Sequence, residues 1–147
     1  MIDYANKIRF IYYEASDGPR LVLFGPLDVD LKSLQALFRQ LAATPNINVQ
    51  LDEQPFVMPR IKIRLSSYDM TGKRPKIPRC GLWKIQDDAA LSYQWSRTCE
   101  EWDDLAELID GLVKTTQAGH QYMTRYPDED AIVVVSKGEY IDDVLEL

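Results

Sequence analysis

The sequence predicts an α+β fold, with a mainly antiparallel sheet and two amphipathic helices on one face of it. Short runs of β-branched and aromatic residues, separated by turns rich in Gly, Pro and Asp, indicate strands. Two longer segments, residues 29–43 and 99–117, carry apolar side chains three and four positions apart, which is the spacing of one helix face. The 147 residues are enough for one core, so we expect a single domain over 1–147.

The first third of the chain predicts a hairpin followed by a helix. Residues 7–14 and 20–25 form its two strands, because the Ser-Asp-Gly-Pro sequence at 16–19 is a strong turn signal. The helix follows at 29–43, with Asp28 or Asp30 as its N-terminal cap and Pro45 marking its end. Its apolar face holds Leu31, Leu34, Leu37, Phe38 and Leu41.

Four further strands are expected before the second helix. Residues 46–52 and 60–66 alternate apolar with polar side chains, which is typical of half-buried strands. Residues 67–79 predict a loop because they contain a glycine and two prolines. Residues 81–86 and 90–97 then predict two strands joined by an acidic turn.

The second helix, at 99–117, opens on a capping box in which Thr98 caps the helix and Glu101 reaches back to the Thr98 N–H. A last strand is expected at 131–136, because its run of Ile and Val suits the centre of a sheet. The resulting order gives both halves of the chain a ββαβ pattern. This pattern indicates an internal pseudo-repeat.

Composition argues against several function classes. No apolar run approaches the roughly 20 residues of a membrane helix, and the N-terminus shows no leader pattern, so we expect a cytoplasmic protein without membrane contact. Cys80 and Cys99 form no CxxC pair, so we expect no metal and no other cofactor. A catalytic cysteine would need His120 beside one of these thiols, and we favour the interpretation that both thiols are small apolar groups.

Charge is divided unevenly along the chain. Residues 1–97 carry a net charge of +4 and residues 98–147 a net charge of −10, which predicts one basic and one acidic surface. The acidic surface is the candidate for binding a partner protein, because carboxylates that match a basic cleft speed association. Its residues are Asp103, Asp104, Glu107, Asp110, Asp128, Glu129 and Asp130. The alternative is a solvated acidic helix that has no partner.

The stretch "GHQYM", residues 119–123, holds the one histidine of the chain. The favoured interpretation is structural: Gly119 ends the second helix in the left-handed conformation, and His120 donates to the last helical carbonyls. The alternative is an acid–base site formed by His120, Tyr122 and Glu139, which requires the strand at 131–136 to bring "SKGEY", residues 136–140, beside them.

Three stretches between residues 95 and 140 resemble a known group: "EEWDDLAELIDGLV", "GHQYM" and "IVVVSKGEY". Together they resemble small bacterial α+β proteins that are grouped with the immunity proteins of polymorphic toxin systems. The resemblance implies a non-enzymatic protein that binds and neutralises a cognate toxin, and it implies no catalytic residue. The matching positions, whose role is unknown, are Gly119, His120, Gln121, Tyr122, Gly138 and Glu139.

We therefore expect a bacterial interaction protein, not an enzyme, with a basic toxin domain as its partner. One open alternative is a nucleic-acid-binding module in the 60–79 region, which uses Arg60, Lys62, Arg64, Lys73, Arg74, Lys76 and Arg79. A sequence pI near 4.8 opposes it. The strand face that Arg60, Lys62 and Arg64 share also lacks the aromatic side chains that such a binding surface needs. The other alternative is a small enzyme centred on His120.

Overall fold

The computed structural model describes residues 6–69, 81–85, 91–124 and 129–140, and it confirms the α+β class. The strands form two sheets of four. The first sheet has the order β1-β2-β8-β7, with β1 at Arg9–Ala15, β2 at Gly18–Gly25, β8 at Ile132–Lys137 and β7 at Gly119–Tyr122. The second has the order β3-β4-β6-β5, with β3 at Asn48–Gln50, β4 at Lys62–Tyr68, β6 at Ser92–Thr98 and β5 at Gly81–Lys84.

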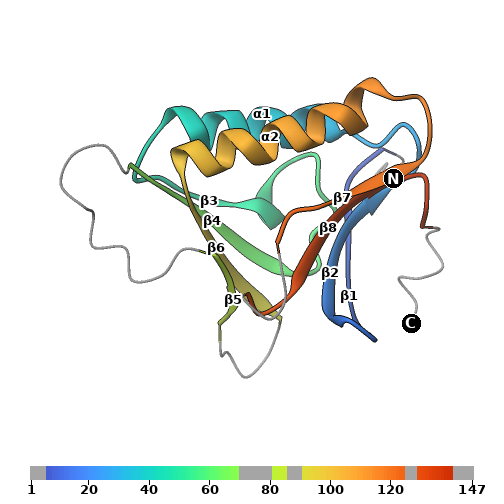
Figure 1. Ribbon diagram of the computed structural model, residues 1–147, viewed down its shortest axis with the longest axis horizontal. Coiled ribbons are helices and arrows are strands. Elements are labelled where there is room, and N and C mark those ends of the chain that lie inside the picture. Colours follow the sequence, from blue (N-terminus) through green and yellow to red (C-terminus); the bar gives the residue numbers. More distant parts are fainter. Residues whose placement is uncertain (1–5, 70–80, 86–90, 125–128, 141–147) are drawn as a thin grey trace.

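Two helices, α1 at Leu31–Ala43 and α2 at Cys99–Lys114, cover both sheets from the same side, as Figure 1 shows. The expected placement of the helices on one face is therefore confirmed. Asp30 caps α1, because its side chain accepts a hydrogen bond from the Ser33 N–H at 3.0 Å. The predicted capping box of Thr98 and Glu101 begins α2. Within the described parts of the chain, no helix combines the length and apolar character needed to cross a bilayer.

Each sheet is antiparallel at its two flanks and parallel at its centre. The parallel pairs are β2 with β8 and β4 with β6, so each central pair joins a strand from one half of the chain to a strand from the other. Periodicity predicts which residues form strands but not which strands pair. The sequence therefore predicted one sheet where the structure has two.

The two halves of the chain are related by an internal pseudo-two-fold arrangement of ββαββ units. The first unit runs from β1 through α1 to β4, apart from the short 3₁₀ turn at Leu51–Glu53, and the second runs from β5 through α2 to β8. Exchanging the units converts the order β1-β2-β8-β7 into β5-β6-β4-β3, which is the second sheet read in reverse. The predicted pseudo-repeat is thus one strand longer than the ββαβ expected.

The main core lies between the two sheets and beneath both helices. Its centre is aromatic: the ring of Trp102 lies 5.0 Å from that of Phe38 and 5.1 Å from that of Trp95, measured between centroids. The predicted apolar face of α1 is confirmed, because all five of its members are buried. A smaller cluster covers the outer face of the first sheet, and consists of Ile11, Val22, Phe24, Ile132 and Val134 with Tyr13 and Tyr140 packed on it.

Two irregular segments connect the sheets and cover part of their edges. The backbone of Ile8 pairs in parallel with Val57, next to the β1 edge. On the other side the Asp130 N–H donates to the Leu82 carbonyl at 3.0 Å, next to the β5 edge. These contacts protect edge backbone groups that would otherwise lie unpaired.

Candidate functional site

The two stretches singled out by the sequence, "GHQYM" and "SKGEY", lie side by side. The first forms β7 and pairs antiparallel with β8, so that His120 is opposite Ser136 and Tyr122 is opposite Val134. Side chains of paired residues in a sheet share a face. His120, Tyr122 and Ser136 therefore project together from the outer face of the first sheet, away from the helices.

Gly138 returns the chain over this face. It has a φ of +73°, and a Cβ at this position would lie 2.7 Å from Leu27 Cδ2, so only glycine fits without strain. The Gly138 N–H also donates to the Gly25 carbonyl at 2.8 Å, which anchors the turn to β2. The turn brings the Glu139 side chain back onto β7 and β8.

Glu139 binds two groups there. Ser136 Oγ donates to Glu139 Oε1 at 2.6 Å, and His120 Nδ1 lies 3.0 Å from both carboxylate oxygens. Because an ionised carboxylate only accepts hydrogen bonds, the neutral histidine carries its proton on Nδ1, which leaves Nε2 as an acceptor. Burial acts to raise the pKa of Glu139, but the hydrogen bonds from Ser136 and His120 outweigh it and hold that pKa below its ordinary value.

A pocket of about 250 Å³ adjoins this cluster, and it is lined by Arg20, His120, Tyr122, Val134, Glu139 and Tyr140. The Arg20 guanidinium lies 5.7 Å from the centroid of the Tyr122 ring, within the range of a cation–π contact. The His120 ring meets the Tyr122 ring edge-on, with centroids 5.3 Å apart. The Tyr140 and Tyr13 hydroxyls are 3.3 Å apart, and burial with this contact raises the pKa of Tyr140 to about 12.

The structural interpretation of "GHQY" as a helix stop is wrong. Helix α2 ends at Lys114, and Gly119 begins β7 without a left-handed backbone. The buried Lys137 takes the role that was expected of His120, because its Nζ donates to the Leu112 carbonyl at 2.6 Å and to the Thr115 carbonyl. A lysine reaches the negative end of the helix from β8, so the helix needs no histidine there.

The condition set for the acid–base alternative is met, since "SKGEY" lies beside "GHQY". The thiol alternative is not supported by the helix geometry. Cys99 is the first residue of α2, whereas a Cβ at Gly119 would lie 3.5 Å from Leu112, near the far end of that helix. Thirteen residues of helix separate these levels by roughly 20 Å. Burial raises the pKa of the Cys99 thiol, which opposes a thiolate role, and Cys80 lies outside the described residues.

Three of the four predicted acidic contact residues on α2 bind groups within the protein. Asp103 and Glu107 both form ion pairs with Arg39 of α1. Asp110 binds Lys114 at 2.6 Å and accepts a hydrogen bond from Gln35 Nε2 at 3.1 Å. Asp104 is exposed and forms no hydrogen bond or ion pair with the described residues. Much of the acidic face of α2 therefore fastens the two helices together.

The acidic stretch at 128–130 was predicted to be a contact surface, but its described residues differ in exposure. Asp128 lies outside the described residues. Glu129 is only 8% exposed, accepts from the Leu82 N–H at 2.9 Å and forms an ion pair with Arg97. Asp130 is exposed but accepts from the Lys84 N–H at 2.8 Å. Glu129 is therefore unavailable to a partner, and sequence reasoning missed this because three acidic residues in a row resemble a solvated loop.

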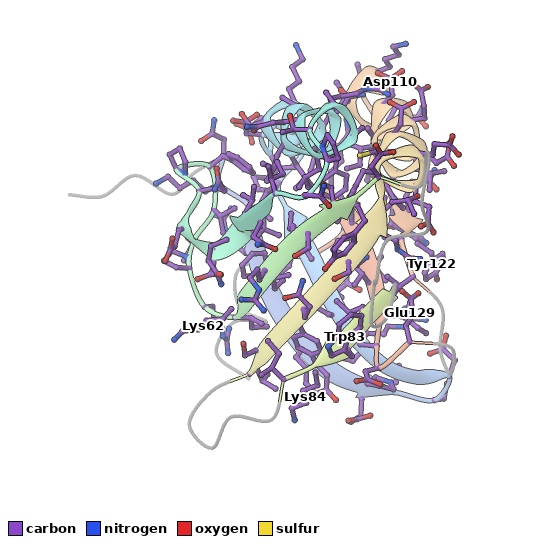
Figure 2. The ribbon with its side chains drawn as sticks, turned by 90° about the vertical axis from the view of Figure 1, so that its left-hand side faces the viewer. Lys62, Trp83, Lys84, Asp110, Tyr122 and Glu129 are labelled. Atoms are coloured by element: carbon purple, nitrogen blue, oxygen red, sulfur yellow. The ribbon has the colours of Figure 1, made fainter. Side chains whose placement is uncertain are left out.

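The predicted basic strand face is present at Lys62 and Arg64, whereas Arg60 precedes β4, which begins at Lys62. Lys62 and Arg64 lie on the outer face of the second sheet, and the pairing registers align Arg64 with Gln94 and Gln94 with Trp83. An aromatic side chain thus shares the face from which aromatic residues seemed absent. Figure 2 shows Lys62 on the left, Trp83 and Lys84 toward the lower end of the sheet, and Tyr122 and Glu129 on the right. The basic residues at 73–79 lie outside the described part, so nucleic-acid binding stays a prediction.

Comparisons of the chain with protein-family models, with curated proteins and with solved structures found no match. In the described part of the chain, no three His, Cys, Asp or Glu side chains cluster so as to hold a metal ion. Sequence reasoning named His120, Tyr122 and Glu139 but missed Arg20, Val134 and Tyr140. These three come from β2, β8 and the turn after it, and only strand pairing brings them together.

We expect Glu139 to make stability depend on pH. Because its folded-state pKa is lowered, its contribution is complete above the ordinary value of 4.5 and is lost as pH falls through the folded pKa. Glu139→Gln should therefore lower the free energy of unfolding at pH 7, by less than about 1 kcal/mol because the side chain is a third exposed, and the deficit should shrink below pH 4.5. Urea denaturation between pH 3 and 7 measures this.

The same comparison in a His120→Gln background isolates the contribution of Ser136, because the hydrogen bond from Nδ1 is then gone. A deficit that is equal at every pH would contradict the assignment of Glu139 as the acceptor of both hydrogen bonds.

Proposed function

We propose that this protein is a cytoplasmic, non-enzymatic interaction protein that binds a basic partner protein, in the manner of a bacterial immunity protein that neutralises a toxin. The acidic charge of residues 98–147 and the stretches shared with that group support the proposal. The contact surface is the outward stripe of α2, defined by Glu100, Asp104, Leu108 and Gly111. We call this set the α2 stripe.

Gly111 is the observation that carries the proposal. It lies inside an α-helix, is exposed, and a Cβ built on it meets nothing within 4 Å. Glycine inside a helix costs roughly 0.5–1 kcal/mol relative to alanine, and no neighbouring group among the described residues requires its small size. A residue that weakens its own helix without a packing reason is expected at a functional surface.

Leu108 and two carboxylates extend this position into an interface. Leu108 is 40% exposed, one of three large apolar side chains so exposed in the described chain. Its neighbours along the stripe are Gly111 on one side and Asp104, followed by Glu100, on the other. An apolar centre with a charged rim is the usual anatomy of a protein–protein contact. A missing side chain at Gly111 would let the partner backbone approach the helix closely.

The electrostatic part of the surface is smaller than the sequence indicated. Asp103 and Glu107 already neutralise Arg39, so reversing their charges would break the contact between helices as well as any contact with a partner. Glu100 and Asp104 are exposed and make no such contact with the described residues. They are the carboxylates that can steer a basic protein without a loss of stability.

The test begins with capture of the partner from the native host and measurement of its affinity for the wild-type protein. We expect Gly111→Gln to weaken binding roughly 10- to 100-fold, because a side chain then fills the open position at the centre of the interface. Gly111→Ala is the matched control for stability, and should raise the free energy of unfolding by about 0.5–1 kcal/mol. Titration calorimetry and urea denaturation measure the two effects.

Two further comparisons decide the proposal. The double variant Glu100→Lys with Asp104→Lys should slow association and flatten its dependence on salt, and co-expression of the wild-type protein should relieve any growth defect that the partner causes. If Gly111→Gln and the double variant bind the partner as the wild type does, the α2 stripe is not the contact surface. If the captured protein has no toxicity, the protein is not an immunity protein.

A further inference from the structure

The pocket beside His120 lies on the outer face of the first sheet, whereas the α2 stripe belongs to the helix layer on the other side of that sheet. A protein partner on the stripe gives no reason for a histidine, a glutamate, an arginine and two tyrosines to line one hollow. We propose that this pocket is a separate binding site for a small planar aromatic carboxylate.

The size and walls of the pocket indicate a single ring. Its volume of about 250 Å³ is below the roughly 300–1,000 Å³ of sites for larger ligands. Val134 supplies an apolar surface, and Tyr122 and Tyr140 supply aromatic ones. Tyr122 is 50% exposed, so much of this large apolar ring has no cover from the described residues. A flat aromatic ligand would cover it and gain offset or edge contacts with both rings.

The polar groups in the lining select a carboxylate. Arg20 carries a positive charge into the pocket. Its ion pair with Asp17, at 2.8 Å, and a contact with the Tyr13 hydroxyl use part of the guanidinium. Guanidinium groups bind carboxylates well because their N–H groups form a planar fork. His120 offers Nε2, since Nδ1 is held by Glu139. When His120 is protonated, Nε2–H becomes a second donor for the ligand.

A proton on the His120 ring can compensate the negative charge of the bound carboxylate. When His120 carries both ring protons, the imidazolium donates from Nδ1 to Glu139 and from Nε2 to the ligand. The charged or titratable groups that face this proton are Glu139, Arg20 with its partner Asp17, and the tyrosines Tyr122, Tyr140 and Tyr13. Glu139 stabilises the imidazolium through the contact of its carboxylate with His120 Nδ1. Affinity should therefore fall as pH rises.

Three matched probes test the proposal: benzoate, the uncharged benzamide and the non-planar cyclohexanecarboxylate. We expect benzoate to shift the backbone NMR signals of residues 120, 122 and 140, with a dissociation constant on the order of 1 mM at pH 6. Benzamide should bind at least about tenfold more weakly because it lacks the charge, and cyclohexanecarboxylate should also bind more weakly because it cannot stack.

Protonation and position are tested by variants. As pH rises, affinity for benzoate should weaken by up to about tenfold per pH unit, the slope for uptake of one proton. His120→Gln should remove this pH dependence, and Arg20→Gln should abolish binding. Lys32→Gln, on the exposed side of α1, is the control that should change neither. The unfolding temperature of each variant establishes that it is folded.

Three outcomes would overturn the proposal. They are the absence of shifts at 10 mM benzoate (a concentration about tenfold above the expected constant), equal binding of benzamide and benzoate, and binding of benzoate that His120→Gln leaves unchanged at every pH. Each result is independent of the partner protein. Failure of the pocket therefore leaves the function proposed for the α2 stripe untouched, and failure of the stripe leaves the pocket untouched.

Discussion

Replacing Trp102 by alanine is expected to lower the free energy of unfolding by about 4–5 kcal/mol. Trp102 is fully buried at the junction of α2, α1 and β6, where its ring contacts those of Phe38 and Trp95. Its Nε1–H donates to the Ser66 carbonyl at 2.9 Å, which ties α2 to β4. Truncation removes a large apolar side chain, leaves a cavity and loses this hydrogen bond. Urea denaturation followed by circular dichroism measures the loss.

Because native proteins of this size are only about 5–15 kcal/mol stable, the alanine variant can unfold altogether. Trp102→Phe is therefore included: it keeps a ring, loses the hydrogen bond and part of the volume, and should cost roughly 2 kcal/mol. Trp83→Phe, at the partly exposed position on β5, is the matched control and should cost less than about 1 kcal/mol. A cost below 1 kcal/mol for both Trp102 variants would contradict a core centred on these rings.

Local signals account for the parts of the fold that the sequence predicted well. The capping box of α2 depends on Thr98 and Glu101, which are three residues apart, and the structure contains both of its hydrogen bonds. The apolar face of α1 likewise depends only on helical spacing. Both features hold because neighbouring residues decide them, and no distant group competes.

Strand β7 shows where local signals fail. It has four residues, and two of its side chains are exposed, so it lacks a buried alternation that would predict a strand. Gly119 after an amphipathic segment also matches a helix end. The sequence therefore predicted a helix end here. In the fold, pairing with β8 makes this segment a strand instead.

The sequence could predict what the residues of the candidate site would do if they met, but it could not predict that they meet. Sequence reasoning could state that Glu139 would orient His120 if their segments met, but only the register of β7 with β8 and the left-handed Gly138 bring them together. The acidic surface shows the opposite case. Helical spacing placed Asp103 and Glu107 correctly on a polar face, but their partner Arg39 lies more than 60 residues away in sequence.

Glu129 gives the second large expected effect. Glu129→Ala should lower the free energy of unfolding by about 3 kcal/mol, because removing one member of a buried ion pair leaves the other charge uncompensated. The Arg97 side chain is only 17% exposed, and its remaining carboxylate is Glu101 at 3.3 Å. The Leu82 N–H also loses its acceptor, which loosens the contact between β5 and the segment entering β8. Urea denaturation of the variant measures the cost.

Two comparisons distinguish this structural role from the partner contact that the sequence predicted for Glu129. Asp130→Ala removes an exposed carboxylate that accepts a hydrogen bond from the Lys84 N–H, and should cost only about 1 kcal/mol. The double variant Arg97→Met with Glu129→Leu replaces the pair by apolar groups of similar length, and should recover most of the loss because no charge is then left buried alone. If Glu129→Ala keeps full stability but weakens binding of the partner, the carboxylate serves the interface instead. A structural ion pair requires the reverse, since the affinity per folded molecule would then stay unchanged while the fold itself weakens.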